Sequence, residues 1–330
     1  MKASCIVFRN ARTAETGTIE VGDPGPGQLL TRTHITGVST GTETRVFRGK
    51  QVGAEFPLIP GYENLGEVVE AGPGTTLNAG QRVFVRNHEY DPAPYTKSWG
   101  SQVSHSVTSE HSVVPVPDEV PDEQAIYAKV AGISLHGIRR ARVREGEWVV
   151  VVGLGIIGHL VVQHAVALGA RVVAIDLDEA RLQLAADAGA EHMLAGGSKD
   201  ILEQVQALTS GGANVAFDAT GRAQTLEATS SYLRPRPWDD SLDHCPRLVL
   251  QGTVEDPVRL DYFSLFMPEV DLITPRDCDT RDIVDSLSLM ASGSIRPELI
   301  PHSLYSFREA GEAYDRLVNR EIMRVLFRWD

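Results

Sequence analysis

The residues of this chain whose spacing is best suited to chemistry are three glycines in the segment Gly153-Leu154-Gly155-Ile156-Ile157-Gly158. The segment follows an apolar run at 149–152 and precedes an apolar stretch with helical spacing. In such a strand–turn–helix unit, the first glycine permits a tight turn, the second lets the backbone approach a pyrophosphate, and the third lets the helix pack closely on the strand. We therefore expect a dinucleotide to be bound at the helix N-terminus by Gly153, Gly155, Ile156, Ile157 and Gly158.

An acidic residue at the end of the next expected strand makes this glycine pattern more specific. Asp176 lies roughly 20 residues beyond the glycines, the spacing at which an acid accepts the ribose hydroxyls of NAD and repels the extra phosphate of NADP. Leu177 follows it, where an arginine would suit NADP. The pattern therefore predicts NAD(H) as the cofactor. Arg181, in the next expected helix, either contacts the adenosine or is a solvated helix residue, and the sequence leaves both readings open.

Two later strand ends are expected to border the same crevice, because ligands of open α/β sheets bind at the carboxyl ends of the strands. The first is the segment 217–221, in which Ala219 and Thr220 are candidate cofactor contacts and Asp218 is interpreted as a loop cap. The second is Gln251, at the end of the following apolar run.

Alternating apolar runs and helical patterns set out the elements that must position these residues. Strands are expected at 148–152, 171–175, 215–217 and 248–250, with helices at 157–168 and 179–188. This alternation predicts an α/β fold with a parallel, doubly wound sheet. Before it come strand-and-turn segments at 29–38, 65–70 and 80–85, a loop at 86–101 and a helix from Pro121 to about Arg142. After it come helices at 279–291 and 307–321, the second with a Ser306–Glu309 capping box, and a strand at 323–329.

Composition excludes several kinds of partner. The 330 residues carry a net charge of −13, which repels phosphate backbones and anionic membranes, so neither a nucleic acid nor a membrane is expected. The three cysteines, Cys5, Cys245 and Cys278, offer neither a disulfide framework nor a Cys-x-x-Cys metal knuckle. The first residues are too short an apolar run for a signal peptide, and no stretch has the length of a membrane span. We expect a cytoplasmic protein that acts on a small molecule.

Several ordered motifs together resemble the medium-chain dehydrogenase/reductase family, which includes the zinc alcohol and polyol dehydrogenases. The segment 60–69, Pro-Gly-Tyr-Glu-Asn-Leu-Gly-Glu-Val-Val, is similar to that family's Pro-Gly-His-Glu-x-x-Gly-x-Val stretch. Residues 79–83 match its Gly-Asp-x-Val turn, and residues 110–118 match its approach to the helix that links two domains. The Ser-x-Gly-Thr-Glu form of residues 39–43 resembles a zinc-less branch that contains bacteriochlorophyllide dehydrogenases and enzymes of bacterial secondary metabolism.

The resemblance implies two domains and a homodimer or homotetramer. It implies a GroES-like, β-rich catalytic domain made of residues 1–125 and 276–330 around a Rossmann NAD-binding domain at residues 126–275. The same family implies hydride transfer between a nicotinamide cofactor and a small-molecule substrate.

The zinc ligands of these relatives are missing from this chain. The resemblance places Ser39 where the first ligand, a cysteine, would stand, Tyr62 at the histidine ligand, and the third ligand near Ala128. A hydroxyl, a phenol and a methyl group cannot hold Zn²⁺ tetrahedrally. No cysteine lies between Cys5 and Cys245 to build a structural zinc lobe. No metal is expected from the remaining candidates either, because they lack the ligand spacing of a defined site: His88, Glu89, His105 and His111.

Without zinc, another group must stabilise the substrate oxygen during hydride transfer. Tyr62 could donate a hydrogen bond to a carbonyl, or accept the proton of an alcohol if its pKa were lowered from about 10. Ser39 could relay that proton, and Glu63, taken as the only nearby acid, could act as general base or orient the pair. The alternative is that Tyr62 and Ser39 fill the emptied zinc site and Glu63 is a structural anchor.

Substrate contacts are expected in two segments. Thr42 and Glu43 are candidates at the nicotinamide end, and Tyr95 and Trp99 could wall the pocket unless their loop is an ordinary surface loop. The sequence thus predicts a zinc-independent NAD(H)-dependent oxidoreductase that interconverts a secondary alcohol and a ketone on a polar substrate, such as a cyclitol, a sugar derivative or a secondary metabolite. Two alternatives stay open: an enoyl- or quinone-type reductase using NAD(P)H, and a non-catalytic NAD-binding protein.

Overall fold

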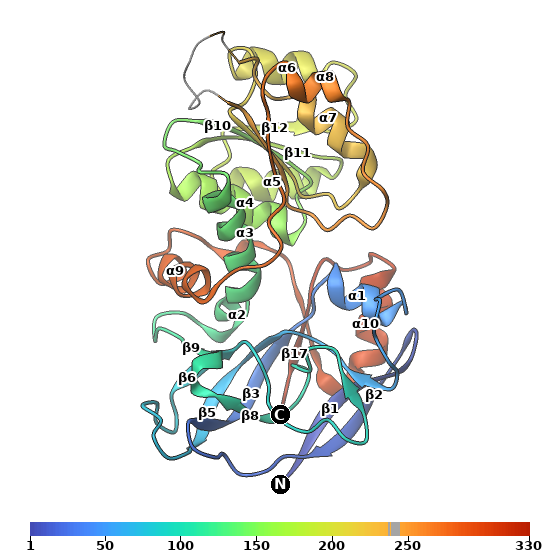
Figure 1. Ribbon diagram of the computed structural model, residues 1–330, viewed down its shortest axis with the longest axis vertical. Coiled ribbons are helices and arrows are strands. Elements are labelled where there is room, and N and C mark those ends of the chain that lie inside the picture. The colour runs from blue at the N-terminus through green and yellow to red at the C-terminus, as the bar shows by residue number, and fades with distance from the viewer. Residues whose placement is uncertain (237, 239–244) are drawn as a thin grey trace. The chain divides into compact units, whose positions relative to one another are not determined.

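The computed structural model describes residues 1–236, 238 and 245–330, and the chain divides into two compact units (Figure 1). The first unit contains Met1–Lys129 and Pro301–Asp330, and the second contains Val130–Ile300. The chain therefore returns to the first unit at Pro301 rather than at the expected residue 276. The difference includes α9 (Thr280–Ala291), whose Asp282 is hydrogen-bonded to α3 (Ala128–Arg140) through His136 and Arg139.

Two largely antiparallel sheets form the first unit. One has the strand order β2-β1-β4-β7 and the other β16-β17-β3-β5-β6-β9, with β8 paired to β3. The strands are β1 Lys2–Asn10, β2 Thr13–Glu20, β3 Gln28–Gly37, β4 Leu58–Ile59, β5 Glu63–Ala71, β6 Arg82–Val85, β7 Thr96–Lys97, β8 His105–Ser109, β9 Val113–Pro115, β16 Ser303–Ser306 and β17 Val325–Arg328. Because β17 pairs with β3, the returning segment completes the sheet that the first third of the chain begins.

An aromatic core joins the returning segment to the N-terminal strands. Helix α10 (Ala310–Val318) places Tyr314 against Phe8 of β1 and Phe47 of α1 (Thr42–Phe47), with ring centroids 4.8 and 5.1 Å apart. All three side chains are fully buried, and burying a large apolar side chain contributes about 1.5–3 kcal/mol. This packing fixes α1, which follows the turn that carries Ser39.

A six-stranded parallel sheet forms the centre of the second unit, with the order β12-β11-β10-β13-β14-β15. Its strands are β10 Trp148–Val152, β11 Arg171–Asp176, β12 His192–Ala195, β13 Val215–Asp218, β14 Arg247–Leu250 and β15 Asp271–Ile273. The helices after them are α4 Ile156–Ala167, α5 Glu179–Asp187, α6 Ile201–Leu208, α7 Leu226–Ser231 and α8 Tyr262–Phe266 (Figure 1). The α/β expectation is confirmed.

Both faces of this sheet are covered, which explains why β10 is apolar at every position. Val151 belongs to one core cluster, together with Val161 of α4, whereas Val150 belongs to a second cluster that contains Val205 of α6. Successive side chains of a strand point to opposite faces, so a strand buried on both faces needs a continuous apolar run. The strand order reverses between β11 and β13, on either side of β10, and the carboxyl ends of strands at such a point line a ligand crevice.

The helix expected from Pro121 to about Arg142 is interrupted. It consists of α2 (Asp122–Ala125) and α3, separated at Ile126 and Tyr127. Four consecutive residues, 125–128, are buried there, whereas a continuous helix at a surface buries one stripe of its residues. Burial against the first unit's core therefore overrides the helical spacing of the sequence.

The expected helix at 307–321 is shorter than its sequence pattern. A 3-10 turn at Phe307–Glu309 precedes α10, which ends at Val318. Arg320 has a left-handed φ of 62°, which a continuing α-helix cannot include. Ser306 and Glu309 form the expected capping box. Within the described part of the chain, no helix combines the length and the apolar character needed to cross a membrane.

Candidate functional site

The glycine loop of the second unit joins β10 to α4. Gly153 has a φ of 87°, a left-handed conformation that glycine adopts without strain. A Cβ at Gly153 would lie 2.9 Å from a backbone nitrogen of the loop after β13, and a Cβ at Gly158 would lie 1.8 Å from the carbonyl oxygen of Gly153. Gly155 is the N-cap of α4, so Ile156 and Ile157 form the first helical positions. The loop therefore presents the free N–H groups of a helix start, which suit a phosphate.

Asp176, at the end of β11, is tied to the glycine loop. Its Oδ2 accepts a hydrogen bond from the backbone N–H of Leu154 at 2.6 Å, and its Oδ1 accepts one from the N–H of Asp178 at 3.0 Å. The Arg181 guanidinium lies 3.8 Å from Asp176 and 3.7 Å from Asp178. Asp176 is thus held at the strand end, where its carboxylate can accept ribose hydroxyls. Arg181 is a partly solvated partner of two acids.

The loop after β13 packs against the glycine loop, as the contact of Gly153 with Thr220 shows. Asp218 accepts hydrogen bonds from the backbone N–H and the hydroxyl of Thr220, at 3.0 and 2.7 Å, and from the hydroxyls of Thr225 and Thr229. Asp218 is therefore a loop cap, and its role is to place Ala219 and Thr220 beside the glycines.

Gln251 departs from its expected role as a cofactor contact. Its side chain is buried, its Nε2 donates to the carbonyl of Ile133 at 3.2 Å, and its amide oxygen packs against Gly137 of α3. A buried amide needs hydrogen-bond partners, and this one finds a partner in α3. The side chain is committed to packing inside the second unit rather than to the crevice.

In the first unit, Tyr62 and Ser39 form a hydrogen-bonded pair, with Tyr62 Oη donating to Ser39 Oγ at 2.7 Å. Ser39 lies in the turn between β3 and α1, and Tyr62 directly precedes β5. The register of β3 and β5 sets Gly37 opposite Glu63, which brings the two flanking hydroxyls together. The Oγ of Ser39 also accepts from the backbone N–H of Thr42 at 3.3 Å. Both acceptor positions of the hydroxyl are then in use, so its own hydrogen is left to donate.

The surroundings of Tyr62 disfavour the loss of its phenolic proton. Burial, reinforced by the negative charges of Glu63 and Glu43 and opposed by the Ser39 hydrogen bond, raises the pKa of its phenol above the ordinary value. The sequence hypothesis let Tyr62 accept the proton of an alcohol only if this pKa fell, so the opposite shift contradicts that branch of the hypothesis. A neutral phenol can still donate a hydrogen bond, and here it donates to Ser39 Oγ.

Glu63 lies in a fully buried ion pair with Arg324, with 2.6 Å between Oε2 and Nη2. The guanidinium also lies over the ring of Tyr127, 4.2 Å from its centroid. This arrangement commits the carboxylate to a cation and favours the reading of Glu63 as a structural anchor over that of a general base. Sequence reasoning missed Arg324, although a cation directly before the apolar run at 325–327 was the available signal.

Glu43 is a second buried acid of this cluster, which corrects the view that Glu63 is the only one. It is 1% exposed and accepts hydrogen bonds from the hydroxyl of Tyr314, from Gln102 Nε2 at 3.0 Å and from the Ser39 N–H at 3.4 Å. Burial raises the pKa of Glu43 to about 8, against the lowering effect of the Tyr314 and Gln102 hydrogen bonds. At this depth Glu43 lies behind Ser39 rather than on an open substrate surface.

A hollow of about 310 Å³ lies beside Trp99 in the first unit. Its lining consists of residues 51–55, Leu58 and residues 96–99. The ring of Trp99 is 46% exposed and meets the ring of Tyr62 edge-on, with 5.7 Å between centroids. Trp99 therefore both lines the hollow and contacts Tyr62, and the lining also includes the polar residues Gln51, Glu55 and Ser98.

Tyr95 does not join Trp99 in this wall. It packs in a core cluster with residues of β1 and β2, its hydroxyl lies 2.7 Å from where a Cβ of Gly17 would be, and Arg9 lies 5.9 Å from its ring centroid. The short strand β7 separates the two aromatic residues, so the expectation that both line one pocket is wrong.

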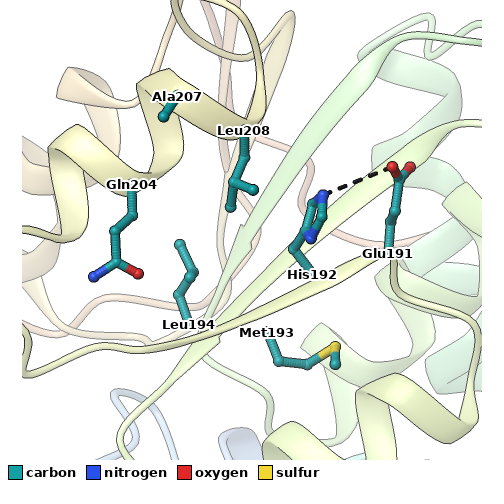
Figure 2. A pocket seen from close by; sticks show the side chains of 7 residues that line it. All are labelled: Glu191, His192, Met193, Leu194, Gln204, Ala207 and Leu208. Atoms are coloured by element: carbon teal, nitrogen blue, oxygen red, sulfur yellow. Dashed lines mark ion pairs between the residues drawn. The ribbon is translucent and has the colours of Figure 1, made fainter.

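A second hollow, of about 450 Å³, lies at the edge of the sheet in the second unit (Figure 2). Figure 2 shows Leu194 and Leu208 between Gln204 on one side and His192 and Glu191 on the other. The Nε2 of His192 lies 3.7 Å from the Oε1 of Glu191. The lining comes from β12, the residue before it and α6. It contains no residue of the glycine loop, so this hollow is separate from the expected cofactor crevice.

The residues at the family's zinc positions do not fit a zinc ion. Ser39 and Tyr62 are neutral hydroxyls bonded to each other, and Ala128 offers a buried methyl group. Tetrahedral zinc needs thiolate, imidazole or carboxylate donors. In the ranges that the structure describes, no three histidine, cysteine or acidic side chains gather around a common point. His88, another candidate ligand, is buried, and its Nδ1 lies 2.8 Å from Ser106 Oγ.

Known proteins share this sequence and architecture. The alcohol dehydrogenase GroES-like domain family matches residues 25–118, and the zinc-binding dehydrogenase family matches residues 157–238. The chain is 26% identical over 322 residues to the 2-desacetyl-2-hydroxyethyl bacteriochlorophyllide A dehydrogenase of Cereibacter sphaeroides, which covers 95% of this chain and 94% of that protein. It is 32% identical over 241 residues to an alcohol dehydrogenase of Schizosaccharomyces pombe, covering 66% of this chain and 68% of that protein.

Solved structures share the fold of this chain as well. An alcohol dehydrogenase of Escherichia coli CFT073, complexed with the cofactor NADH, superposes with a TM-score of 0.85 at 18% identity and covers 99% of both chains. The matched families, the identity to the yeast enzyme and the shared fold together show that this chain belongs to the medium-chain, zinc-type dehydrogenase family of oxidoreductases.

Proposed function

We propose that this chain is an NAD(H)-dependent oxidoreductase that interconverts a secondary alcohol and its ketone without zinc. The observation that carries the proposal is the 2.7 Å hydrogen bond between Tyr62 and Ser39, at the two positions where zinc ligands would stand. A positioned hydroxyl donor can stabilise the charge that develops on a substrate oxygen, which is the task of zinc in metal-dependent dehydrogenases. The relatives named as dehydrogenases of an alcohol and of a hydroxyethyl group support chemistry at a CH–OH carbon.

The proton path follows from the hydrogen bonds of Ser39. Its Oγ accepts from Tyr62 and from the N–H of Thr42, so its own hydrogen is directed to a third partner. In ketone reduction, Ser39 gives its proton to the substrate oxygen as hydride reaches the carbon, Tyr62 gives its proton to Ser39, and water restores the proton of Tyr62; alcohol oxidation reverses each transfer. Glu63 takes no part in this transfer and, with Arg324, fixes the start of β5.

The cofactor assignment rests on the second unit. The backbone of Gly153–Gly158 would hold the pyrophosphate, the carboxylate of Asp176 would accept the ribose hydroxyls, and Ala219 and Thr220 would border the dinucleotide. The bound nicotinamide supplies the hydride acceptor or donor. Because the Leu154 N–H anchors Asp176, an extra ribose phosphate would meet a fixed negative charge, which supports NAD(H) over NADP(H).

We further propose a polar substrate with several hydroxyl groups. The hollow beside Trp99 combines an aromatic wall with the polar side chains of Gln51, Glu55 and Ser98, and such a mixture suits a cyclitol or sugar-like molecule. We expect the protein to act in the cytoplasm as a homodimer or homotetramer. Size-exclusion chromatography with light scattering would measure the oligomeric state.

The test compares the wild type with Tyr62→Phe and Ser39→Ala, and uses Tyr95→Phe as a matched control at a phenol that packs elsewhere. With NADH and a panel of hydroxyketones, both site variants should lose about 10²–10⁴-fold in the rate of reduction while NADH affinity is unchanged. Metal analysis of the purified enzyme should show no activity-linked zinc. Unchanged rates in both site variants, or activity that requires a metal, would overturn the proposal.

The same panel separates the alternatives. Reduction of an enone but not of a ketone would indicate an enoyl-type reductase. Tight NADH binding without turnover of any alcohol, ketone or enone would indicate a non-catalytic NAD-binding protein.

A further inference from the structure

The buried cluster behind Ser39 contains two carboxyl groups and one guanidinium. Glu43 is 1% exposed, and Glu63 and Arg324 are 0% exposed. Arg324 pairs with Glu63 at 2.6 Å, and Glu43 makes no ion pair with any described residue. The groups that face Glu43 are the phenols of Tyr314 and Tyr62 and the carboxylate of Glu63, so no cation offsets a charge on it directly.

The hydrogen bonds around Glu43 are fixed by the surrounding core. Trp329 Nε1 donates to Thr36 Oγ1 at 2.9 Å, and Thr36 Oγ1 donates to Gln102 Oε1 at 2.5 Å. This orients the amide of Gln102 so that its Nε2 points to Glu43. Tyr314, which donates from the other side, is held by stacking on Phe47. Three donors therefore contact the carboxyl group, and they are neutral.

Neutral donors offset only part of the cost of burying the charge of Glu43, because its burial outweighs the effect of the Tyr314 and Gln102 hydrogen bonds. An ionised carboxylate in an apolar interior costs several kcal/mol unless a cation pairs with it, and such a group takes up a proton instead. Glu63 already uses the buried guanidinium, and its own negative charge acts on Glu43. Burial raises the pKa of Glu43 to about 8, as expected for a carboxyl group that has no cation beside it.

The protonation of Glu43 is coupled to the hydroxyl pair. Glu43 accepts from the backbone of Ser39, and its negative charge is one cause of the raised pKa of Tyr62. When Glu43 is neutral, the phenol releases its proton more readily. When Glu43 ionises, a second uncompensated charge stands behind the pair, and the phenol holds its proton more tightly.

We propose that Glu43 is a positioning residue which the site carries protonated at neutral pH and which, on ionising in alkaline solution, weakens proton donation by the Tyr62–Ser39 pair. It follows that the rate of carbonyl reduction depends on pH: the rate is highest while Glu43 is neutral and declines as Glu43 ionises. Its kinetic part rests on the proposed function, whereas the ionisation itself is a property of the unliganded chain.

The first experiment measures unfolding by urea from pH 4 to 9 for the wild type, Glu43→Gln and the exposed-acid control Glu119→Gln. The unfolded chain releases the Glu43 proton near its ordinary pKa of about 4.3, whereas the folded chain keeps it up to about pH 8. Wild-type stability should therefore fall across this window relative to Glu43→Gln, by roughly several thousandfold in the unfolding equilibrium constant. Glu119→Gln should follow the wild type. Parallel curves for wild type and Glu43→Gln would overturn the proposal.

A second variant keeps the carboxyl group of Glu43 and serves as the test if the Glu43→Gln protein does not fold. Tyr314→Phe removes the hydroxyl that donates to Glu43 while keeping the stacked ring, so Glu43 should ionise at higher pH and the fall in stability should extend further into alkali. A fall that ends at the same pH as in the wild type would contradict the proposed ionisation.

The second experiment follows single-turnover reduction of dihydroxyacetone, as a probe hydroxyketone, by the NADH-loaded enzyme between pH 6 and 10. The wild-type rate should decline above about pH 8, and Glu43→Gln should hold its rate beyond that point. A decline shared by both proteins would overturn the coupling to Tyr62. If no carbonyl compound turns over, the proposed function fails, and the unfolding experiment still decides whether Glu43 is protonated.

Discussion

The two units of this chain build their sites in different ways. In the second unit, the glycine loop offers backbone N–H groups, and its shape depends on missing side chains: a Cβ at Gly158 would lie 1.8 Å from a carbonyl oxygen. In the first unit, the hydroxyl pair, the two carboxyl groups behind it and the partners of those carboxyl groups are all side chains. They come from the turn after β3, α1, the start of β5 and the residue before it, α10, and the residue before β17. A backbone site tolerates change at most positions, whereas a side-chain site depends on each member.

This difference explains which chemistry is fixed and which varies. A dinucleotide phosphate needs only a helix start and room, and these survive sequence divergence. Stabilisation of a substrate oxygen needs a specific donor, and in the proposed function this donor is the hydrogen-bonded pair of Tyr62 and Ser39. The β3–β5 register fixes the backbone next to Ser39 and Tyr62. The side chains at these two positions can therefore differ between proteins that keep the same fold.

The largest expected effect comes from breaking the buried ion pair of the first unit. Arg324→Met leaves the Glu63 carboxylate without its partner at 0% exposure, and loss of one member of a buried pair costs about 3–5 kcal/mol. Urea unfolding should show this loss, and the double variant Arg324→Met/Glu63→Gln should recover part of it. A loss below 1 kcal/mol would mean that the pair does not anchor β5 and would weaken the contrast between the two sites.

A smaller effect is expected from crowding the glycine loop. Gly158→Ala places a methyl group against the Gly153 carbonyl, and overpacking of this kind costs about 1–3 kcal/mol, which corresponds to up to a hundredfold weaker NADH binding. Fluorescence titration of NADH measures the change. Gly197→Ala is a matched control, because its nearest new contact would be at 3.9 Å and should leave binding intact. Equal affinities for both variants would show that the loop is less constrained than its backbone contacts indicate.

Removal of one charge should change cofactor preference. Asp176→Asn retains an oxygen for the N–H of Leu154 but loses the negative charge at the end of β11. A unit charge acting over about 4 Å is worth ~1–4 kcal/mol near a surface, so the ratio of NADPH to NADH affinity should rise by about tenfold or more. Competition titrations with both nucleotides test this prediction, and an unaltered ratio would remove the support for NAD(H) selectivity.

The smallest effect is expected at the pocket wall. Trp99→Ala removes the ring that meets Tyr62 edge-on, a contact worth about 0.5–1.5 kcal/mol. The KM for the probe hydroxyketone should rise about three- to tenfold with little change in single-turnover rate. The converse result, an unchanged KM with a slower rate, would place Trp99 in the alignment of Tyr62 rather than in substrate binding.

The parts of the molecule that follow from local sequence were predictable. The glycine loop, the strands β10 and β11 and the capping box at Ser306 each depend on neighbours within a few residues. Ser39 and Tyr62 could be named as a pair only through resemblance to a family, because the register that joins β3 to β5 is not written in either segment alone.

The parts that depend on distant contacts were not predictable. Arg324 reaches Glu63 across 261 positions of the chain, and Tyr314 reaches Glu43 across 271, so neither partner is visible from the spacing of motifs. The depth of Glu43 was missed for the same reason, since the aromatic core that buries it comes from α10. The packing of Tyr95 and the hydrogen bond of Gln251 to Ile133 could not be foreseen either, because a residue type shows what a side chain can bind, whereas packing decides which way it points.

The pairing of β17 with β3 also has a consequence for biosynthesis. A ribosome makes β3 and β5 early, then the whole of Val130–Ile300, and only afterwards the strand that closes their sheet. Domains usually fold as units during translation. The parallel sheet of the second unit can therefore fold while the first unit still lacks β17, its last strand to be made. Until that strand arrives, the nascent chain must carry Glu63 without a counterion, in contact with water or a chaperone.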